Sequence, residues 1–271
     1  STANASKTVL IGHQTNGGPS LVDFDRFGHS VANLGDVNGD GINDLAVGAS
    51  QDDTGGPGRG AVYVLMMNAD GTSSTFTKIA DGSGGLALAT QDRFGVSVAG
   101  LGDIDGDGVP DLAVGAYYDG AQDRGAVHIL KLNADGTVKG ATKIANGSGV
   151  SLATYDFFGG SLAAIGDMDG DGITEIAVGA QGDGTGDRGE IHVVFLNSAG
   201  GAKSEVRIAD NVNGGPLLAD NDLFGRSVAS LGDIDGDGVP DLAVGATGDD
   251  TNGTDRGAVH ILRMNANGTV K

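Results

Sequence analysis

The sequence contains no cysteine, few aromatic residues and no long apolar run. Without cysteine the chain can form neither a disulfide framework nor a thiol nucleophile. No segment approaches the roughly 18 to 20 apolar residues that span a bilayer, and no charged leader precedes an apolar run. The chain starts at Ser1, which suits a processed chain or an excised fragment. We therefore expect no membrane insertion.

Positive charge is also scarce, because 16 Lys and Arg residues stand against 36 Asp and Glu residues. The formal net charge of −20 repels phosphate backbones and anionic lipid surfaces, so nucleic acids and membranes are not expected partners. Glycine, by contrast, accounts for 51 of the 271 residues, and aromatic residues for only 4%. This composition favours many short strands and tight turns over large helices with bulky cores.

One unit is repeated four times along the chain. The dipeptide Phe-Gly recurs roughly every 65 residues, each time followed by an acidic glycine loop, an Ala-Val-Gly-Ala run and an Arg-Gly pair. Two of the copies share identical sixteen-residue stretches, Leu101 to Ala116 and Leu231 to Ala246. Such self-similarity at a fixed period is typical of repeat architectures. The Phe-Gly pairs begin at Phe27, Phe94, Phe158 and Phe224.

Each unit is predicted to form four β-strands, because its apolar runs are short, β-branched and separated by turn residues. The predicted fold class is all-β, a β-propeller of four-stranded antiparallel blades within a single domain, 1–271. Residues 7–27 align with 204–224, so the N-terminal strand is expected to complete the last blade. A fragment of a larger ring, an eight-bladed ring of two chains and an open array stay as alternatives. The predicted units are approximately 27–80, 94–145, 158–209 and 224–271 plus 1–13.

The acidic loops predict metal sites. Oxygen-bearing side chains at loop positions 1, 3 and 5 can converge where a glycine at position 6 allows a sharp turn, and the carbonyl at position 7 and an acid at position 9 complete the cage. Only hard oxygen ligands are present, which selects calcium over zinc or copper, with about four ions, one per repeat. The predicted ligands are Asp36, Asn38, Asp40, Ile42 and Asp44; Asp103, Asp105, Asp107, Val109 and Asp111; Asp167, Asp169, Asp171, Ile173 and Glu175; and Asp233, Asp235, Asp237, Val239 and Asp241.

These loops differ from an EF-hand, which needs an acid at position 12 and flanking helices. Position 12 here is an apolar valine in every copy, at Val47, Val114, Val178 and Val244. The simpler alternative is that Asp, Asn and Gly only make good turns, but the pattern recurs four times in register. Four divalent ions would change the formal net charge from −20 to −12.

The combined motif resembles the FG-GAP repeats of integrin α-subunit propellers and their bacterial relatives. The resemblance rests on Phe27-Gly28, Gly48-Ala49 and the loop between them, and on the equivalent stretches Phe94 to Ala116, Phe158 to Ala180 and Phe224 to Ala246. It implies a β-propeller with calcium held in blade hairpin loops, a secreted or cell-surface location, and a role in adhesion or protein contact.

Two functions are compatible with these features, and neither is enzymatic. The first is an extracellular module that binds a protein or glycan; the second is a building block of a homo-oligomeric assembly formed through strand exchange. A calcium-assisted polysaccharide lyase is a third alternative, for which Tyr117 and Tyr118 are the only candidate residues. The tyrosine pair could instead stack on a sugar or pack between blades. The repeated histidines His128, His192 and His260 are interpreted as packing residues.

Overall fold

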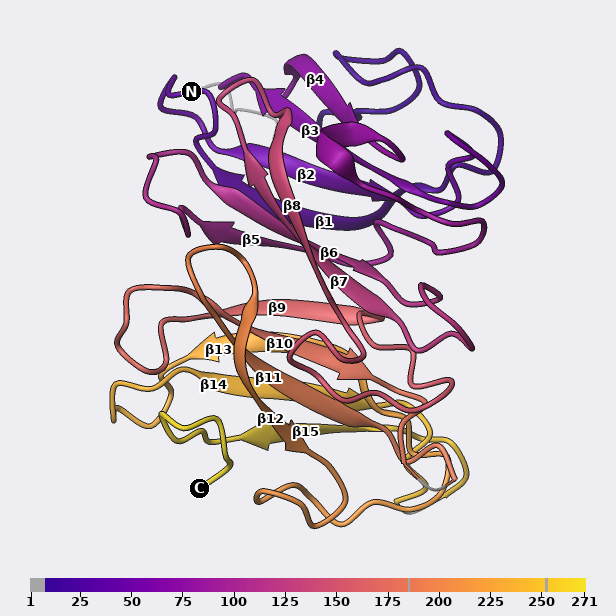
Figure 1. Ribbon diagram of the computed structural model, residues 1–271, viewed down its shortest axis with the longest axis vertical. Helices are drawn as coiled ribbons and strands as arrows, with labels where there is room; N and C mark the ends of the chain where they lie inside the picture. The colour runs from indigo at the N-terminus through magenta and orange to yellow at the C-terminus, as the bar shows by residue number, and fades with distance from the viewer. Residues whose placement is uncertain (1–7, 185, 252) are drawn as a thin grey trace, which may run out of the picture.

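The computed structural model describes residues 8–184, 186–251 and 253–271 (Figure 1). These residues form four antiparallel sheets, which we call blades 1 to 4, and one short 3-10 helix, η1 (Ser83–Gly85). Blade 1 consists of β1 (Phe27–Gly35), β2 (Asp44–Ala49), β3 (Ala61–Met67) and β4 (Ser73–Ile79); blade 2 of β5 (Val98–Gly102), β6 (Asp111–Ala116), β7 (Ala126–Leu132) and β8 (Val138–Ala145); blade 3 of β9 (Ser161–Gly166), β10 (Glu175–Ala180), β11 (Glu190–Leu196) and β12 (Ala202–Ile208); and blade 4 of β13 (Phe224–Gly232), β14 (Asp241–Ala246) and β15 (Ala258–Leu262).

The strands of each blade are paired in chain order, and the blades follow one another around a common axis. The first strand of each blade lies nearest the axis, with β1 against β5, β5 against β9 and β9 against β13. The all-β fold class and the four-bladed propeller predicted from the repeats are therefore confirmed. No helix in the described ranges is long and apolar enough to span a bilayer.

The repeated spacing of small and apolar residues within the chain explains how the blades pack. The Ala-Val-Gly-Ala run forms the second strand of each blade, which is buried on both faces and therefore apolar at nearly every position. Its glycine permits the closest approach between blades: a Cβ on Gly115 would lie 2.0 Å from the Gly159 carbonyl oxygen of blade 3. The phenylalanine that opens blades 2, 3 and 4 is fully buried at each junction, as Phe94, Phe158 and Phe224.

The expectation that the N-terminal strand completes the last blade is not met by the described residues. Blade 4 has three strands, and the segment from residue 8 onwards lies on blade 1, where the Asn16 carbonyl accepts a hydrogen bond from the Ser73 amide (2.9 Å). The equivalent bond precedes blade 4, where the Asn213 carbonyl accepts a hydrogen bond from the Val270 amide (2.9 Å). Residues 204–208, which align with 7–11, form part of β12 in blade 3, however, so this bond concerns the Asn-Gly-Gly segment and not the predicted strand. The Asn-Gly-Gly segment therefore binds the blade that follows it. Residues 1–7, which are part of the predicted strand, lie outside the described residues.

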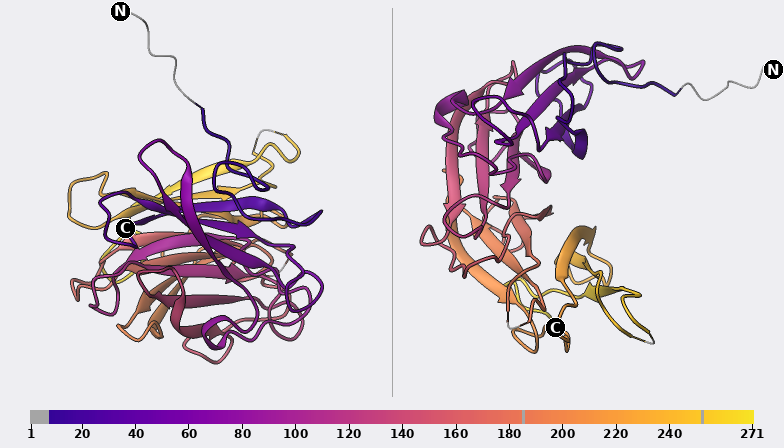
Figure 2. Two further views of the ribbon diagram at one scale, coloured as in Figure 1. Left: turned by 90° about the horizontal axis from the view of Figure 1, so that it is seen from above. Right: turned by 90° about the vertical axis from the view of Figure 1, so that its right-hand side faces the viewer.

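The blades form an open arc. Figure 2 (right) shows the sheets following one another along a curve from blade 1, in indigo, to blade 4, in yellow, with the curve open between these two. β13 does not pack on β1 in the way that the other first strands pack on one another. The acidic loops connect the first and second strands of the blades, and all four therefore occupy equivalent positions along the arc.

Candidate metal centres in the blade loops

The first aspartate of each loop organises the turn. In blade 2, Asp103 Oδ1 accepts hydrogen bonds from the amides of Gly106 (2.7 Å) and Asp107 (3.1 Å), and Oδ2 accepts one from Gly108 (2.7 Å). Gly106 and Gly108 adopt φ values of +80° and +88°, which only glycine adopts without strain. The equivalent residues Asp36, Asp167 and Asp233 accept corresponding bonds in their loops.

The acid at position 9 connects the loop to the blade. Asp111 is fully buried, and its carboxylate accepts hydrogen bonds from the amides of Ile104 in the loop (3.1 Å) and Leu132 on β7 (2.9 Å). Burial raises the pKa of Asp111 to about 6 despite these two bonds. A nearby cation would favour its ionised form. Asp44 and Asp241 make the same pair of bonds in blades 1 and 4.

Blade 3 has a glutamate at this position, and one of its oxygens has no partner among the described residues. Glu175 Oε2 accepts a hydrogen bond from the Met168 amide (2.8 Å), whereas Oε1 is buried and makes none. Burial raises the pKa of Glu175 to about 7, and the nearby Asp169 carboxylate adds to this increase. A buried carboxylate oxygen without a donor is costly unless it is paired, and a bound cation would satisfy it.

Three carboxylates converge in each of the last three loops. In blades 2, 3 and 4, one ligand oxygen from each of positions 1, 3 and 9 lies within 4.8 Å of the others. These are oxygen-only donor sets of the kind that calcium prefers. The three groups are Asp103, Asp105 and Asp111; Asp167, Asp169 and Glu175; and Asp233, Asp235 and Asp241.

The acid at position 5 has a different immediate role. Asp107 Oδ1 accepts a hydrogen bond from the Val109 amide (2.9 Å), which is residue 7 of the loop. The same bond joins Asp40 to Ile42, Asp171 to Ile173, and Asp237 to Val239. This hydrogen bond therefore links the predicted side-chain ligand at position 5 directly to the amide of the residue whose carbonyl is the predicted ligand at position 7.

The first loop has an amide where the others have a second carboxylate. Asn38 Nδ2 donates a hydrogen bond to Asp40 Oδ2 (3.0 Å), and the Asp40 amide donates one to Asn38 Oδ1 (2.9 Å). Asp36, Asp40 and Asp44 thus give this loop three carboxylates, whereas each of the other loops has four.

A lysine next to three of the loops was not identified from the sequence. Lys139 Nζ lies 2.8 Å from Asp105 Oδ2 and also contacts Asp107. Lys203 and Lys271 contact positions 3 and 5 of their own loops in the same way, and the corresponding residue of blade 1 is Ser74. The lysine is therefore present where position 3 is Asp and absent where it is Asn, so every loop region has a formal charge of −3. The Thr-Val-Lys shared by two repeats was the available signal.

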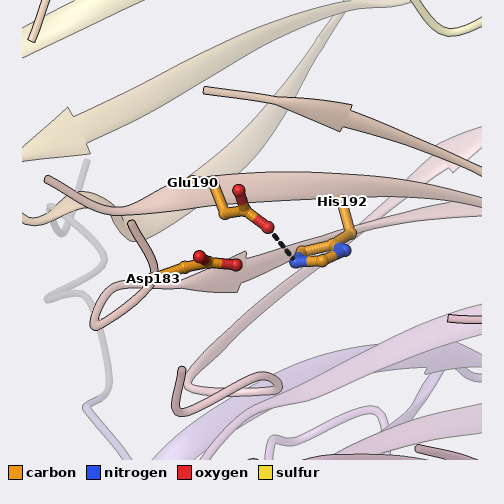
Figure 3. A group of neighbouring side chains, drawn as sticks. All are labelled: Asp183, Glu190 and His192. Atoms are coloured by element: carbon orange, nitrogen blue, oxygen red, sulfur yellow. Dashed lines mark ion pairs between the residues drawn. The ribbon is translucent and has the colours of Figure 1, made fainter. Parts of the chain in front are cut away.

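Blade 3 contains a second group of ionisable residues away from the loops (Figure 3). Asp183, Glu190 and His192 are all buried, and His192 Nε2 lies 2.8 Å from Glu190 Oε1. Burial alone would lower the pKa of His192, but the carboxylates of Glu190 and Glu205 raise it to about 9. Arg207 Nε also donates a hydrogen bond to Glu190 (2.7 Å). The histidine and arginine supply two positive charges against the carboxylates of Glu190 and Glu205, and burial raises the pKa of Asp183 to about 8, so this group is a buried ion-pair network.

The repeated histidines lie against the phenylalanine that opens each blade. His128, His192 and His260 meet Phe94, Phe158 and Phe224 edge-on, with ring centroids 5.0 to 5.5 Å apart. This arrangement agrees with their interpretation as packing residues. Glu190 replaces an alanine that occupies the equivalent position in the other three blades, so blade 3 alone carries this additional buried acid.

The two adjacent tyrosines face different cavities. Their rings lie 4.0 Å apart, and Tyr117 borders a cavity of about 420 Å³ near the axis. Tyr118 borders a second cavity of about 750 Å³, together with Tyr155, Phe157 and Lys143. Burial raises the pKa of Tyr117 to about 12, so its hydroxyl stays protonated near neutral pH.

Comparisons with known proteins agree with the repeat structure. The profile of the FG-GAP repeat family matches residues 27–65, 94–130, 158–194 and 224–262. Integrin alpha-5 of Xenopus laevis is 32% identical over 246 residues, which cover 88% of this chain and 21% of the relative. Integrin alpha-PS2 of Drosophila melanogaster is 37% identical over 57% of this chain and 11% of its own length. Human integrin alpha-IIb is 42% identical over 37% of this chain. The chain thus spans about a fifth or less of these relatives.

Proposed function

The chain belongs to the FG-GAP repeat family, and on that premise we propose that it is a calcium-binding propeller that acts outside the cell as an adhesion module. In this role it is secreted or held at the cell surface, contacts a protein or glycan ligand, and has no enzymatic activity. The observation that carries the proposal is the convergence of three carboxylates within 4.8 Å in each of three loops. The integrin alpha subunits among its relatives support an adhesive role.

Calcium fits these loops on chemical grounds. Like charges this close repel one another, and a divalent cation would convert the repulsion into attraction. The unpartnered Glu175 Oε1 offers a buried ligand atom in blade 3, and Asp105 Oδ1 offers another in blade 2. A bound ion would fix each loop across the first two strands of its blade, and its role would be structural. We propose one ion per blade, held by all the residues at positions 1, 3, 5, 7 and 9.

The proposed location follows from the same sites. Exposed extracellular modules hold calcium with dissociation constants of about 10⁻⁴ to 10⁻³ M, which are useful only where the ion is abundant. The carboxylates at positions 1 and 5 of these loops are exposed, except for the partly buried Asp36, as expected for sites in this range. A cytoplasmic protein with such sites would remain largely metal-free.

Calorimetric titration with calcium, together with thermal unfolding in calcium and in EDTA, tests the metal sites. We expect binding of about four ions and a higher melting temperature in calcium. Asp105→Asn should remove or weaken one site, whereas Asp135→Asn should leave all sites intact. Asp135 is a suitable control because it lies in an exposed turn, and blade 4 has Asn267 at the equivalent position. Identical melting curves in calcium and EDTA, with no heat of binding, would refute the proposal.

The cavity beside Tyr118 is the proposed ligand site. Tyr118, Tyr155 and Phe157 place aromatic rings around it, and Asp92 and Lys143 add polar groups, a combination suited to stacking on and bonding a sugar. The net charge of −20 favours neutral over acidic sugars.

An array of neutral oligosaccharides, probed with the wild-type chain and two variants, tests this site. Tyr155→Ala should abolish binding, whereas Phe24→Ala should retain it. Phe24 is the control because it occupies the equivalent position of blade 1 and is 85% exposed. If no neutral oligosaccharide binds, or if Tyr155→Ala binds normally, the glycan ligand is wrong and a protein ligand is favoured.

A second candidate function is a building block of a homo-oligomeric assembly. The observation that favours it is the open arc, since within the described part of the chain blades 1 and 4 each leave one side without a neighbouring blade. The lyase alternative is not favoured, because the raised pKa of Tyr117 keeps its hydroxyl from acting as a base near neutral pH.

A further inference from the structure

The three junctions between blades are built in the same way. A serine on the first strand of one blade, or directly before it in the case of Ser97, donates a hydrogen bond to the carbonyl of the Phe-Gly glycine of the next blade. The three bonds are Ser30 to Gly95 (2.9 Å), Ser97 to Gly159 (2.7 Å) and Ser161 to Gly225 (2.9 Å). A parallel bridge also joins the Arg-Gly glycine of one blade to the phenylalanine of the next, in the pairs Gly60 and Phe94, Gly125 and Phe158, and Gly189 and Phe224.

Blade 4 has the side chains for a fourth junction, but they face solvent. Leu231, Ile234, Val259 and Ile261 are 39%, 51%, 69% and 52% exposed. The residues at these four positions in blades 1 to 3 are at most 4% exposed, because the following blade covers them. They are Leu34, Val37, Val62 and Val64 in blade 1; Leu101, Ile104, Val127 and Ile129 in blade 2; and Ile165, Met168, Ile191 and Val193 in blade 3. We call the four residues of blade 4 the open face.

Backbone spacing identifies the same missing neighbour. A Cβ on Gly48, Gly115 or Gly179 would lie 2.0 Å from the Phe-Gly carbonyl oxygen of the next blade. A Cβ on Gly245, the equivalent residue of blade 4, would meet only the side chain of its own blade's Ser227 at 2.4 Å. At blade 4, none of the described residues therefore fills the space that a neighbouring Phe-Gly carbonyl occupies at the other junctions.

Blade 1 carries the complementary half of a junction. In blades 2 to 4 the Phe-Gly glycine approaches a carbonyl of the preceding blade, whereas no atom of the described residues lies within 4 Å of a Cβ built on Gly28. Val31 is 59% exposed, but its equivalent in blade 2, Val98, is 8% exposed and packs against blade 1. The Asn-Ala-Asp-Gly turn at residues 68–71 is identical in sequence to the turn at 133–136, whose Gly136 packs on Val64 of the preceding blade. A Cβ on Gly71 would meet Val9 at 3.5 Å, as one on Gly268 meets Val206 of β12 at 3.2 Å, so the N-terminal segment lies where the fourth strand of a preceding blade would lie.

We propose that the open face of blade 4 docks on blade 1 of a second copy of this chain, in a head-to-tail arrangement. The inference rests on the second candidate function and names its interface. Ser227 would donate to the Gly28 carbonyl of the second copy, and Val259 and Ile261 would be covered by its blade 1. A second copy is favoured as occupant because blade 1 supplies the Phe-Gly pair and the turn that the other junctions use. The contact is heterologous, so it leads either to a closed ring of chains or to an open filament.

Light scattering over a range of chain concentrations in calcium tests the docking. The wild-type chain should exceed the monomer mass of 26.8 kDa as its concentration rises. Ile261→Asp should weaken association about tenfold or more, because it places a charge in the docked interface. Gly245→Ala should do the same with a single methyl group. Leu217→Asp is the matched control, because Leu217 is 79% exposed and its equivalents in blades 1 to 3 are exposed as well.

Mixing two variants distinguishes head-to-tail docking from other contacts. Ile261→Asp blocks the blade 4 end and Val31→Asp blocks the blade 1 end, so each variant alone should be monomeric. Their mixture retains one intact pair of ends and should form a dimer and nothing larger. Circular dichroism and melting temperatures check that both variants fold, which is expected because both side chains are more than half exposed.

The reactivity of a cysteine at position 261 distinguishes the two outcomes in which the chain is monomeric. One outcome is a chain that remains monomeric at every concentration and in which a cysteine introduced at position 261 reacts readily with a thiol-labelling reagent. This would overturn the proposal in favour of a further blade in a longer polypeptide. A monomer in which that cysteine is protected would indicate that blade 4 closes on blade 1 of the same chain, and this too overturns it. Calcium binding measured on the Ile261→Asp monomer reports on the metal sites independently of assembly.

Discussion

The glycine of the Ala-Val-Gly-Ala run offers a quantitative test of how the blades pack. In Gly115→Ala the new methyl group would lie 2.0 Å from the Gly159 carbonyl oxygen and 2.2 Å from Ser97 Oγ, so blades 2 and 3 must separate. Overpacking of this kind costs about 1–3 kcal/mol. Loss of the hydrogen bond from Ser97 to Gly159 adds about 0.5–1.5 kcal/mol. We therefore expect a loss of about 2–4 kcal/mol in the free energy of unfolding, or roughly 10 °C in melting temperature.

The same substitution at the end of the arc provides the internal control. In Gly245→Ala the methyl group meets only Ser227 Oγ within 3.5 Å, and that oxygen can rotate away. The expected loss is about 1 kcal/mol or less, provided that the measurement is made on dilute, monomeric chain. Urea unfolding and differential scanning calorimetry of both variants supply the comparison. Equal losses for the two variants would show that junction spacing does not determine the stability of this arc.

Three further predictions concern the ionisable residues. Asp111→Ala leaves two buried amides without an acceptor and should cost about 2–6 kcal/mol in EDTA, where any metal contribution is absent; a loss below about 1 kcal/mol would contradict the described role. Lys139→Met removes the cation that pairs with positions 3 and 5, so calcium titration should show tighter binding in one site, and unchanged or weaker binding would contradict the expected competition. His192 has a folded-state pKa of about 9, above its unfolded value, so the stability it contributes is complete below pH 6.5 and declines as the pH rises through 9. Unfolding measurements from pH 6 to 10 should show this decline in the wild type and a smaller one in Glu190→Ala.

Much of the fold could be predicted because each repeat has its own complete set of local signals. The Phe-Gly pair, the acidic loop and the Ala-Val-Gly-Ala run determine strands and turns within one blade, and these interactions are close in sequence. The position of the N-terminal segment could not be predicted from its alignment with 204–224. That alignment matches residues 8–11 with the end of β12, which pairs within blade 3, whereas the hydrogen bond from the Ser73 amide to the Asn16 carbonyl holds the following segment on blade 1.

The loop residues could be predicted better than their surroundings. Asp103 and Asp111 follow from the spacing within the loop, whereas Lys139 reaches the loop from a strand about thirty residues further along. Contacts of this kind depend on the register of the blade. Glu190 was equally hard to interpret, because its position is occupied by alanine in the other blades and its partner Arg207 lies on the next strand.

The constant formal charge of the loop regions has a consequence for how such a chain can grow by duplication. Along the sequence, the second and third strands of the blade separate the aspartate at position 3 from the lysine that pairs with it, as with Asp105 and Lys139. Recombination between them would join a four-carboxylate loop to a strand with serine, as at Ser74, or a three-carboxylate loop to a strand with lysine. The smallest segment that can be copied without disturbing this balance therefore runs from the acidic loop to the start of the fourth strand.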